Sequence, residues 1–305
     1  MNFLFRFSAI VLAPALLAQA PPQKKYPPQP ASWVDPDKSE PAGTHYKTFP
    51  SKFAASSALP SDEVSYLIYL PPGYETNTAK RYPVVYWLHG LNGNQRAFST
   101  FLQQMVPVAA AGKIPEMIVV GVNGMKDSFY NDSPDGKWPI ESVIIKELIP
   151  YIDKTYRTLT RRESRAIEGY SMGSYGAAHL GFKYPELFGI VGVNAGALIT
   201  PRAAVQPAVY AKMFGSDDAY VQANDPLVLL RKNASAIRGK TIIRVAVGGD
   251  DSLLPNNKKL HDTLTELNIE HDWEIVPGVA HNPPLFYKTL GEKSMVNYVK
   301  AWHGL

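Results

Sequence analysis

The sequence contains no cysteine among its 305 residues. Disulfide bonds, thiolate metal sites and a cysteine nucleophile are therefore excluded. An excess of charge of one sign is missing as well, because 31 Lys and Arg against 27 Asp and Glu leave a formal net charge of only +4. The basic residues are scattered along the chain, whereas a nucleic-acid-binding protein gathers them on one face. We therefore expect no nucleic acid among the partners.

Long apolar runs are missing too, apart from one near the beginning of the chain. Residues 1–6 form a short, positively charged segment, and residues 9–17 are apolar. Residues 18–20 read Ala-Gln-Ala, a small-residue cleavage signature. This order is typical of a secretory signal peptide, and the run is short for a helix that spans a bilayer. We predict a signal peptide over residues 1–20, a secreted or periplasmic protein, and no stable membrane insertion.

Proline is concentrated directly after the predicted signal peptide. Residues 21–45 contain many prolines, which remove backbone donors and disfavour regular structure. We predict that this stretch is a linker or a loosely packed arm. Residues 46–305 show no repeat and no second change in composition, so they are expected to form a single domain.

Short apolar segments alternate with segments of helical character along this domain. The strand-like segments are residues 64–70, 82–88, 117–122, 188–193, 242–247 and 272–276. The helix-like segments are residues 140–156, 175–184, 258–267 and 295–302. The alternation predicts an α/β fold with a mostly parallel central sheet and helices on both faces. Sites in such folds form at the carboxyl ends of the strands.

One serine lies in a distinctive position between a strand-like and a helix-like segment. Residues 169–173 read Gly-Tyr-Ser-Met-Gly. A serine at the centre of this pattern occupies a sharp turn, where glycines two positions before and after it avoid steric clashes. The helix that follows directs its amide dipoles at the reacting centre. We predict that Ser171 is a nucleophile; the alternative is a glycine-rich turn with a solvent-facing serine.

A serine nucleophile requires a general base, and the sequence offers seven histidines. In this type of fold the base follows the serine in the chain. Four later histidines lie within a predicted helix, at the start of a strand or near the end of the chain: His179, His261, His271 and His303. Only His281 follows the carboxyl end of a predicted strand in a loop. We predict that it is the base.

The remaining groups of the site are predicted from their positions after strands. The acid that orients the base should leave the end of the preceding strand. Asp250 and Asp251 both qualify, and Asp251 is favoured because it lies one position further from the strand. Two backbone N–H groups are needed to bind an oxyanion. We assign them to Met172, after the serine, and to Leu91, in the loop after residues 82–88.

With these residues, the sequence resembles a known family, the putative esterases among the α/β hydrolases. This family includes feruloyl esterases, acetyl-xylan esterases, S-formylglutathione hydrolase and mycobacterial mycolyltransferases. The segments that carry the resemblance are residues 83–90, 147–153, 165–173, 184–188 and 249–253. The resemblance covers residues 64–302 and implies a single α/β-hydrolase domain, with the family's acid on Asp251 and its histidine on His281. Tyr170 and Ser174 depart from the family's usual Gly-Leu-Ser-Met-Gly-Gly.

The predicted chemistry is the hydrolysis of an ester through an acyl-enzyme, and it requires no metal or organic cofactor. Asp132, Asp135 and Glu141 match no calcium-loop spacing. Export favours esters linked to plant polysaccharide, of the feruloyl or acetyl type, as the resemblance implies. An acyltransferase with a sugar acceptor and a hydrolase-fold binding protein without activity are the alternatives. The sequence does not indicate an oligomeric state.

Aromatic residues in the predicted loops over the catalytic edge are the candidates for contact with the substrate. They are Tyr170, Trp138 and Phe98, together with Phe129 and Tyr130. Such residues line an aromatic or acyl slot or, equally often, form a minor core.

Overall fold

The computed structural model describes residues 31–198 and 207–302. The predicted signal peptide, residues 1–20, lies outside the described residues, as do residues 21–30 of the predicted proline-rich segment. Within the described ranges, no helix combines the length and the apolar character needed to cross a bilayer.

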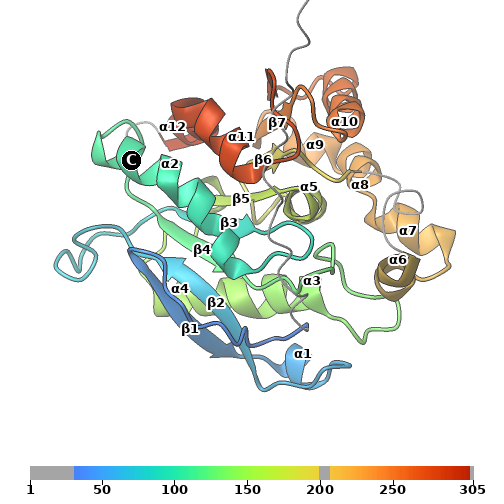
Figure 1. The fold of residues 1–305 in the computed structure, drawn as a ribbon, viewed down its shortest axis with the longest axis horizontal. Helices are drawn as coiled ribbons and strands as arrows, with labels where there is room; N and C mark the ends of the chain where they lie inside the picture. Colours follow the sequence, from blue (N-terminus) through green and yellow to red (C-terminus); the bar gives the residue numbers. More distant parts are fainter. Residues whose placement is uncertain (1–30, 199–206, 303–305) are drawn as a thin grey trace, which may run out of the picture.

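A single eight-stranded sheet runs through the molecule (Figure 1). Its strands are β1 (Thr44–Pro50), β2 (Glu63–Tyr69), β3 (Val84–Leu88), β4 (Ile118–Val122), β5 (Arg165–Tyr170), β6 (Ile190–Asn194), β7 (Ile242–Gly248) and β8 (Asp272–Val276). They are arranged in the order β1-β2-β4-β3-β5-β6-β7-β8. The first two pairs in this order are antiparallel and the others are parallel. The prediction of a mostly parallel sheet is confirmed.

Helical segments connect the strands. Those in the first half are α1 (Lys52–Ala55), η1 (Gln95–Phe98), α2 (Ser99–Ala110), α3 (Ile140–Ser142), the π-helical η2 (Val143–Leu148), α4 (Ile149–Thr155) and η3 (Arg162–Ser164). Those in the second half are α5 (Met172–Lys183), α6 (Pro207–Phe214), α7 (Asp218–Asn224), α8 (Pro226–Lys232), α9 (Ala234–Ile237), α10 (Leu254–Glu266), α11 (Pro283–Leu290), η5 (Gly291–Met295) and α12 (Val296–Trp302).

The two faces of the sheet bury separate apolar cores, because successive strand residues point to opposite faces. On β3, Val84, Tyr86 and Leu88 belong to one core, whereas Val85 and Trp87 belong to the other. The first core includes side chains of α3, α4 and α5, and the second includes side chains of α2, α11 and α12. Figure 1 shows α2, α11 and α12 on one side of the sheet and α3 and α4 on the opposite side. The helices therefore cover both faces, as predicted.

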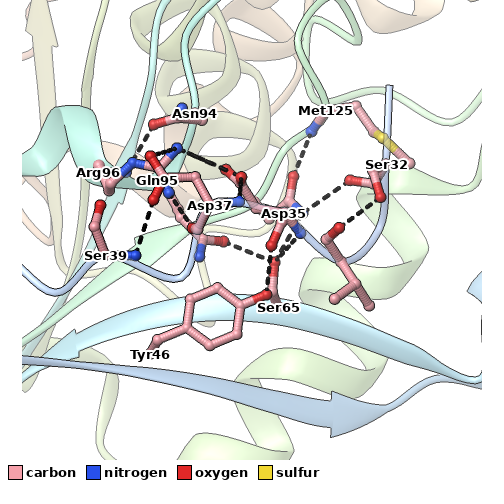
Figure 2. Close-up of polar contacts among 12 residues, drawn as sticks. Ser32, Asp35, Asp37, Ser39, Tyr46, Ser65, Asn94, Gln95, Arg96 and Met125 are labelled. Atoms are coloured by element: carbon pink, nitrogen blue, oxygen red, sulfur yellow. Dashed lines mark hydrogen bonds and ion pairs between the residues drawn. The ribbon is translucent and has the colours of Figure 1, made fainter. Parts of the chain in front are cut away.

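The described part of the proline-rich segment packs against the first strands (Figure 2). Trp33 is only 1% exposed, and its indole N–H donates to Ser57 Oγ at 2.9 Å. Farther along, the carboxylates of Asp35 and Asp37 each lie 3.2 Å from the guanidinium of Arg96 at the start of η1. Asp35 N also donates to Ser65 Oγ of β2 at 2.9 Å, so the segment is tied both to the sheet and to the end of the loop that follows β3.

Several elements were not predicted from the sequence: β1, α2, the short helices α6 to α9, and α11. The most consequential is α11, which begins immediately after the loop that contains His281. Its first residues are Pro283 and Pro284, and proline fits the first turn of a helix, where a backbone N–H has no partner within the helix. Asn282 caps this turn, because its side-chain oxygen accepts from Leu285 N at 3.1 Å.

Candidate active site

Ser171 lies in a sharp turn between β5 and α5. Its φ of 59° and ψ of −118° fall in a region that residues other than glycine rarely adopt. The two flanking glycines make the turn possible. A Cβ atom at Gly169 would lie 2.4 Å from the carbonyl carbon of Gly173, and one at Gly173 would lie 2.0 Å from Leu88 O. The turn is fixed from the neighbouring strand by a hydrogen bond from Ser171 N to Asn194 O at 3.1 Å.

His281 and Asp251 complete a chain of hydrogen bonds that ends at this serine. His281 Nε2 lies 2.9 Å from Ser171 Oγ, and His281 Nδ1 lies 2.8 Å from Asp251 Oδ2. A carboxylate can only accept, so Nδ1 carries the proton and Nε2 presents its lone pair to the serine hydroxyl. The other Asp251 oxygen accepts from Leu253 N at 2.8 Å. The Asp251 side chain is fully buried, whereas that of His281 is 36% exposed.

The other candidates for base and acid lie elsewhere. Asp250 is exposed on the surface beside the buried Asp251. His179 is buried in α5 against Glu141, at 2.7 Å. His261 and His271 pair with each other, at 2.7 Å between ring nitrogens. His303 lies outside the described residues.

The loop after β3 runs directly beside the serine. A Cβ atom at Gly90 would lie 3.3 Å from Ser171 Cβ, which brings the next residue, Leu91, to the edge of the site. The loop is held by hydrogen bonds from Gly93 N to Gly90 O at 3.0 Å and from Asn92 N to Lys126 O at 2.7 Å. Met172 is the first residue of α5, where the N–H groups have no acceptor within the helix.

His89 supports this loop from below. It is fully buried, and its Nδ1 donates to Gly90 O at 2.9 Å. Burial lowers the pKa of His89 to about 4, so the ring is neutral at pH 7. A neutral ring bonded to the main chain has a structural role in the loop.

A cavity of about 360 Å³ opens above Ser171. It is lined by Trp87, Gly90, Leu91, Ala97, Thr100, Tyr170, Ser171, His281, Pro283 and Pro284. One wall comes from the β3 loop and the start of α2, and the opposite wall comes from the start of α11. Most of these side chains are apolar, so the cavity suits an uncharged group next to the serine.

Of the three residues predicted to contact a substrate, Tyr170 lines this cavity. Its ring packs against the His281 imidazole, with 5.0 Å between ring centroids. Phe98 is fully buried in the core beside Gly121 and does not line the cavity. Trp138 lies at a separate hollow with Pro134, under the ammonium of Lys212 at 4.8 Å from the ring centroid.

Of the two alternatives left open for the loop aromatics, Phe129 and Tyr130 follow the second. Both are buried in the core, where Tyr130 Oη donates to His89 O at 3.0 Å. Trp87, Pro283 and Pro284 line the cavity but were not predicted from the sequence. Trp87 was interpreted as a strand residue alone, although its place two residues before His89-Gly90, near a strand end, was a signal that it could reach the site.

The acidic residues considered for calcium each bind protein groups. Asp132 accepts from the main chain and hydroxyl of Ser142, and Asp135 accepts from Ser133 Oγ. Glu141 contacts His179 and Lys183 in a buried cluster. Across residues 31–198 and 207–302, no three His, Asp or Glu side chains are grouped so that they could hold a metal ion.

The strand order, with a serine turn at the end of β5 and a histidine and an aspartate from loops after later strands, is that of the α/β-hydrolase fold. The structure is similar to that of a ferulic acid esterase, with a TM-score of 0.72 and 24% identity, over 85% of this chain and 98% of the other. The family model of the putative esterases matches residues 56–282. The chain therefore belongs to the putative esterase family.

Two curated relatives are similar in sequence. An endo-1,4-beta-xylanase/feruloyl esterase from Xylanibacter ruminicola is 33% identical over 156 residues, which cover 48% of this chain and 21% of the relative. An esterase from Mycobacterium tuberculosis is 27% identical over 240 residues, which cover 69% of this chain and 51% of the relative. The matched regions thus span about a fifth and about half of the lengths of these relatives.

Proposed function

We propose that the protein is a serine carboxylic-ester hydrolase in which Ser171 is the nucleophile, His281 the base and Asp251 the orienting acid. The observation that carries this proposal is the continuous chain of hydrogen bonds from Asp251 through His281 to Ser171 at the floor of an apolar cavity. Membership of the putative esterase family supports the same reaction class.

In this mechanism His281 Nε2 takes the Ser171 proton while Oγ attacks the ester carbonyl carbon. Asp251 stabilises the imidazolium that forms. The N–H groups of Leu91 and Met172 bind the tetrahedral oxyanion. As the intermediate collapses, His281 gives the proton to the departing alcohol and leaves an acyl group on Ser171. Water, activated by the same histidine, then releases the acid.

We further propose that the substrates are feruloyl- or acetyl-type esters of plant polysaccharide and that the protein acts in the periplasm or outside the cell. Trp87 and Tyr170 give the cavity an aromatic lining, which suits a planar acyl group. The similarity to a protein named endo-1,4-beta-xylanase/feruloyl esterase supports this substrate class. The signal peptide predicted over residues 1–20 supports the location.

Replacement of Ser171 tests the reaction class. Ser171→Ala should lower kcat/KM for a feruloyl or acetyl ester by at least about 10³-fold, because the nucleophile is removed while the cavity is kept. Asp250→Ala is the matched control, since this exposed neighbour of Asp251 should leave turnover within about two-fold. A panel of feruloyl, acetyl and longer acyl esters then defines the acyl group. Wild-type turnover by Ser171→Ala would overturn the proposal.

A further inference from the structure

A buried polar cluster lies directly beneath the serine turn. It consists of six residues, each at most 3% exposed, which we call the Glu168 cluster: Trp87, Glu168, Asn194, Arg244, Tyr287 and Tyr298. They come from β3, β5, β6, β7, α11 and α12. The sheet makes room for the central carboxylate, because a Cβ atom at Gly192 would lie 2.8 Å from Glu168 Cγ.

The Glu168 carboxylate is held by three donors. Tyr298 Oη lies 2.5 Å from Oε2, while Tyr287 Oη and Asn194 Nδ2 lie 3.1 and 3.0 Å from Oε1. Burial raises the pKa of Glu168, and these donors and the nearby Arg244 oppose that rise. Arg244 joins the cluster through Asn194 Oδ1, at 3.0 Å. Buried polar groups of this kind are weak evidence of a contribution to stability, because an apolar core of the same volume would avoid their desolvation.

Within the cluster, the Tyr287 hydroxyl joins three neighbouring strands. It donates to Glu168 on β5 at 3.1 Å and accepts from Trp87 Nε1 on β3 at 3.2 Å. Asn194 Nδ2, at the end of β6, lies 3.3 Å away. A single hydroxyl is therefore bonded on three sides, which fixes its position against the sheet.

These contacts reach both proposed reacting side chains. Asn194 holds the serine turn, because its O accepts from Ser171 N at 3.1 Å and its Nδ2 lies 3.1 Å from Gly169 O. Tyr287 belongs to α11, which begins two residues after His281. The His281 side chain is partly exposed, so its position depends on the helix that follows it.

We propose that Tyr287 is a positioning residue, whose hydroxyl fixes α11, and with it His281, at hydrogen-bonding distance from Ser171. This inference rests on the proposed roles of Ser171 and His281. Without the hydroxyl the helix keeps its apolar contacts, but its register against β5 is no longer defined by a directional bond. The distance from Nε2 to Oγ then varies, and proton transfer becomes less efficient.

The test compares Tyr287→Phe with Tyr298→Phe in the full chain. Both changes remove one hydroxyl from Glu168, but Tyr298 lies on α12, which carries none of the proposed reacting groups. For Tyr287→Phe we expect kcat for an aryl ester to fall about ten-fold with KM nearly unchanged, and the rate of Ser171 labelling by a fluorophosphonate to fall in parallel. Tyr298→Phe should lower the melting temperature while both rates stay within about two-fold.

A wild-type kcat for Tyr287→Phe, or an equal loss for Tyr298→Phe, would overturn the positioning role. If Tyr287→Phe does not fold, Glu168→Gln takes its place, because it weakens the acceptor of the same hydroxyl; a fall in kcat supports the role and an unchanged kcat contradicts it. A wild-type protein that neither hydrolyses esters nor reacts with the fluorophosphonate would instead overturn the proposed function. The two failures are therefore distinguishable.

Discussion

At the scale of single residues, the site depends on backbone atoms that approach one another closely. Gly169 and Gly173 face each other across the serine turn, and Gly173 also lies against the end of β3. A side chain at either position meets main-chain atoms, which cannot rotate away as a flexible side chain can. The glycines at positions 169 and 173 are therefore required by the close packing of the main chain, whereas the serine between them is required by the proposed reaction.

Gly173→Ala should lower the free energy of unfolding by about 3 kcal/mol or more and abolish ester turnover, because its Cβ would lie 2.0 Å from Leu88 O. Gly249→Ala is the matched control. It also lies at a strand end, but its Cβ would be 3.4 Å from Val276 O, which is ordinary van der Waals contact. Denaturant unfolding of both variants checks the prediction, which is wrong if the two are equally stable.

At the scale of elements, the sequence predicted the parts of the fold that have strong periodicity. The apolar strands β3 and β4 and the serine turn were placed within a few residues of their observed bounds. The edge strand β1 was missed, because only Thr44 and Phe49 in it are buried and they do not alternate as in a half-buried strand. The helix α11 was missed because its first two residues are proline.

The candidate site was predictable where its residues directly follow strands, with the acid and the histidine after the serine in the chain. That rule selected Ser171, Asp251 and His281, which the structure brings into one chain of hydrogen bonds. The substrate-contacting residues were less predictable, because whether an aromatic side chain faces a cavity or the core depends on packing between distant elements. Phe98 is the example, since it fills space beside Gly121 instead of lining the cavity.

The segment before β1 is an element whose contribution to stability can be measured. Trp33→Ala should lower the free energy of unfolding by about 3–5 kcal/mol, because a fully buried indole and its hydrogen bond to Ser57 are lost. Lys38→Ala, an exposed position in the same segment, should change it by less than about 0.5 kcal/mol. Urea unfolding compares the two variants. Equal free energies of unfolding would mean that the side chain of Trp33 does not stabilise the fold.

At the scale of the whole molecule, Glu141, a buried residue outside the cavity, makes stability depend on pH in acid. Although burial acts in the opposite direction, contacts with His179, Lys183 and Tyr184 lower the pKa of Glu141 to about 2. The folded state thus releases this proton more readily than the unfolded chain, where the pKa is near 4.5. The resulting stabilisation is present above about pH 4.5 and is lost as the pH falls toward 2.

Glu141→Gln should therefore reduce the acid dependence of stability. We expect the wild type to lose on the order of 3 kcal/mol more than the variant between pH 6 and pH 2, since each pKa unit corresponds to about 1.4 kcal/mol. Glu292→Gln, at an exposed surface pair with Lys113, is the control and should follow the wild type. Chemical unfolding at both pH values tests this, and parallel losses in all three proteins would contradict it.

The cavity has walls from two distant parts of the chain, the β3 loop with the start of α2 and the start of α11. Ribosomal synthesis completes the first wall and the serine turn more than a hundred residues before the second wall and His281 exist. A nascent chain that has reached β6 therefore carries Ser171 without its hydrogen-bonding partner. In the proposed mechanism, such a chain has its nucleophile but lacks the base that would activate it.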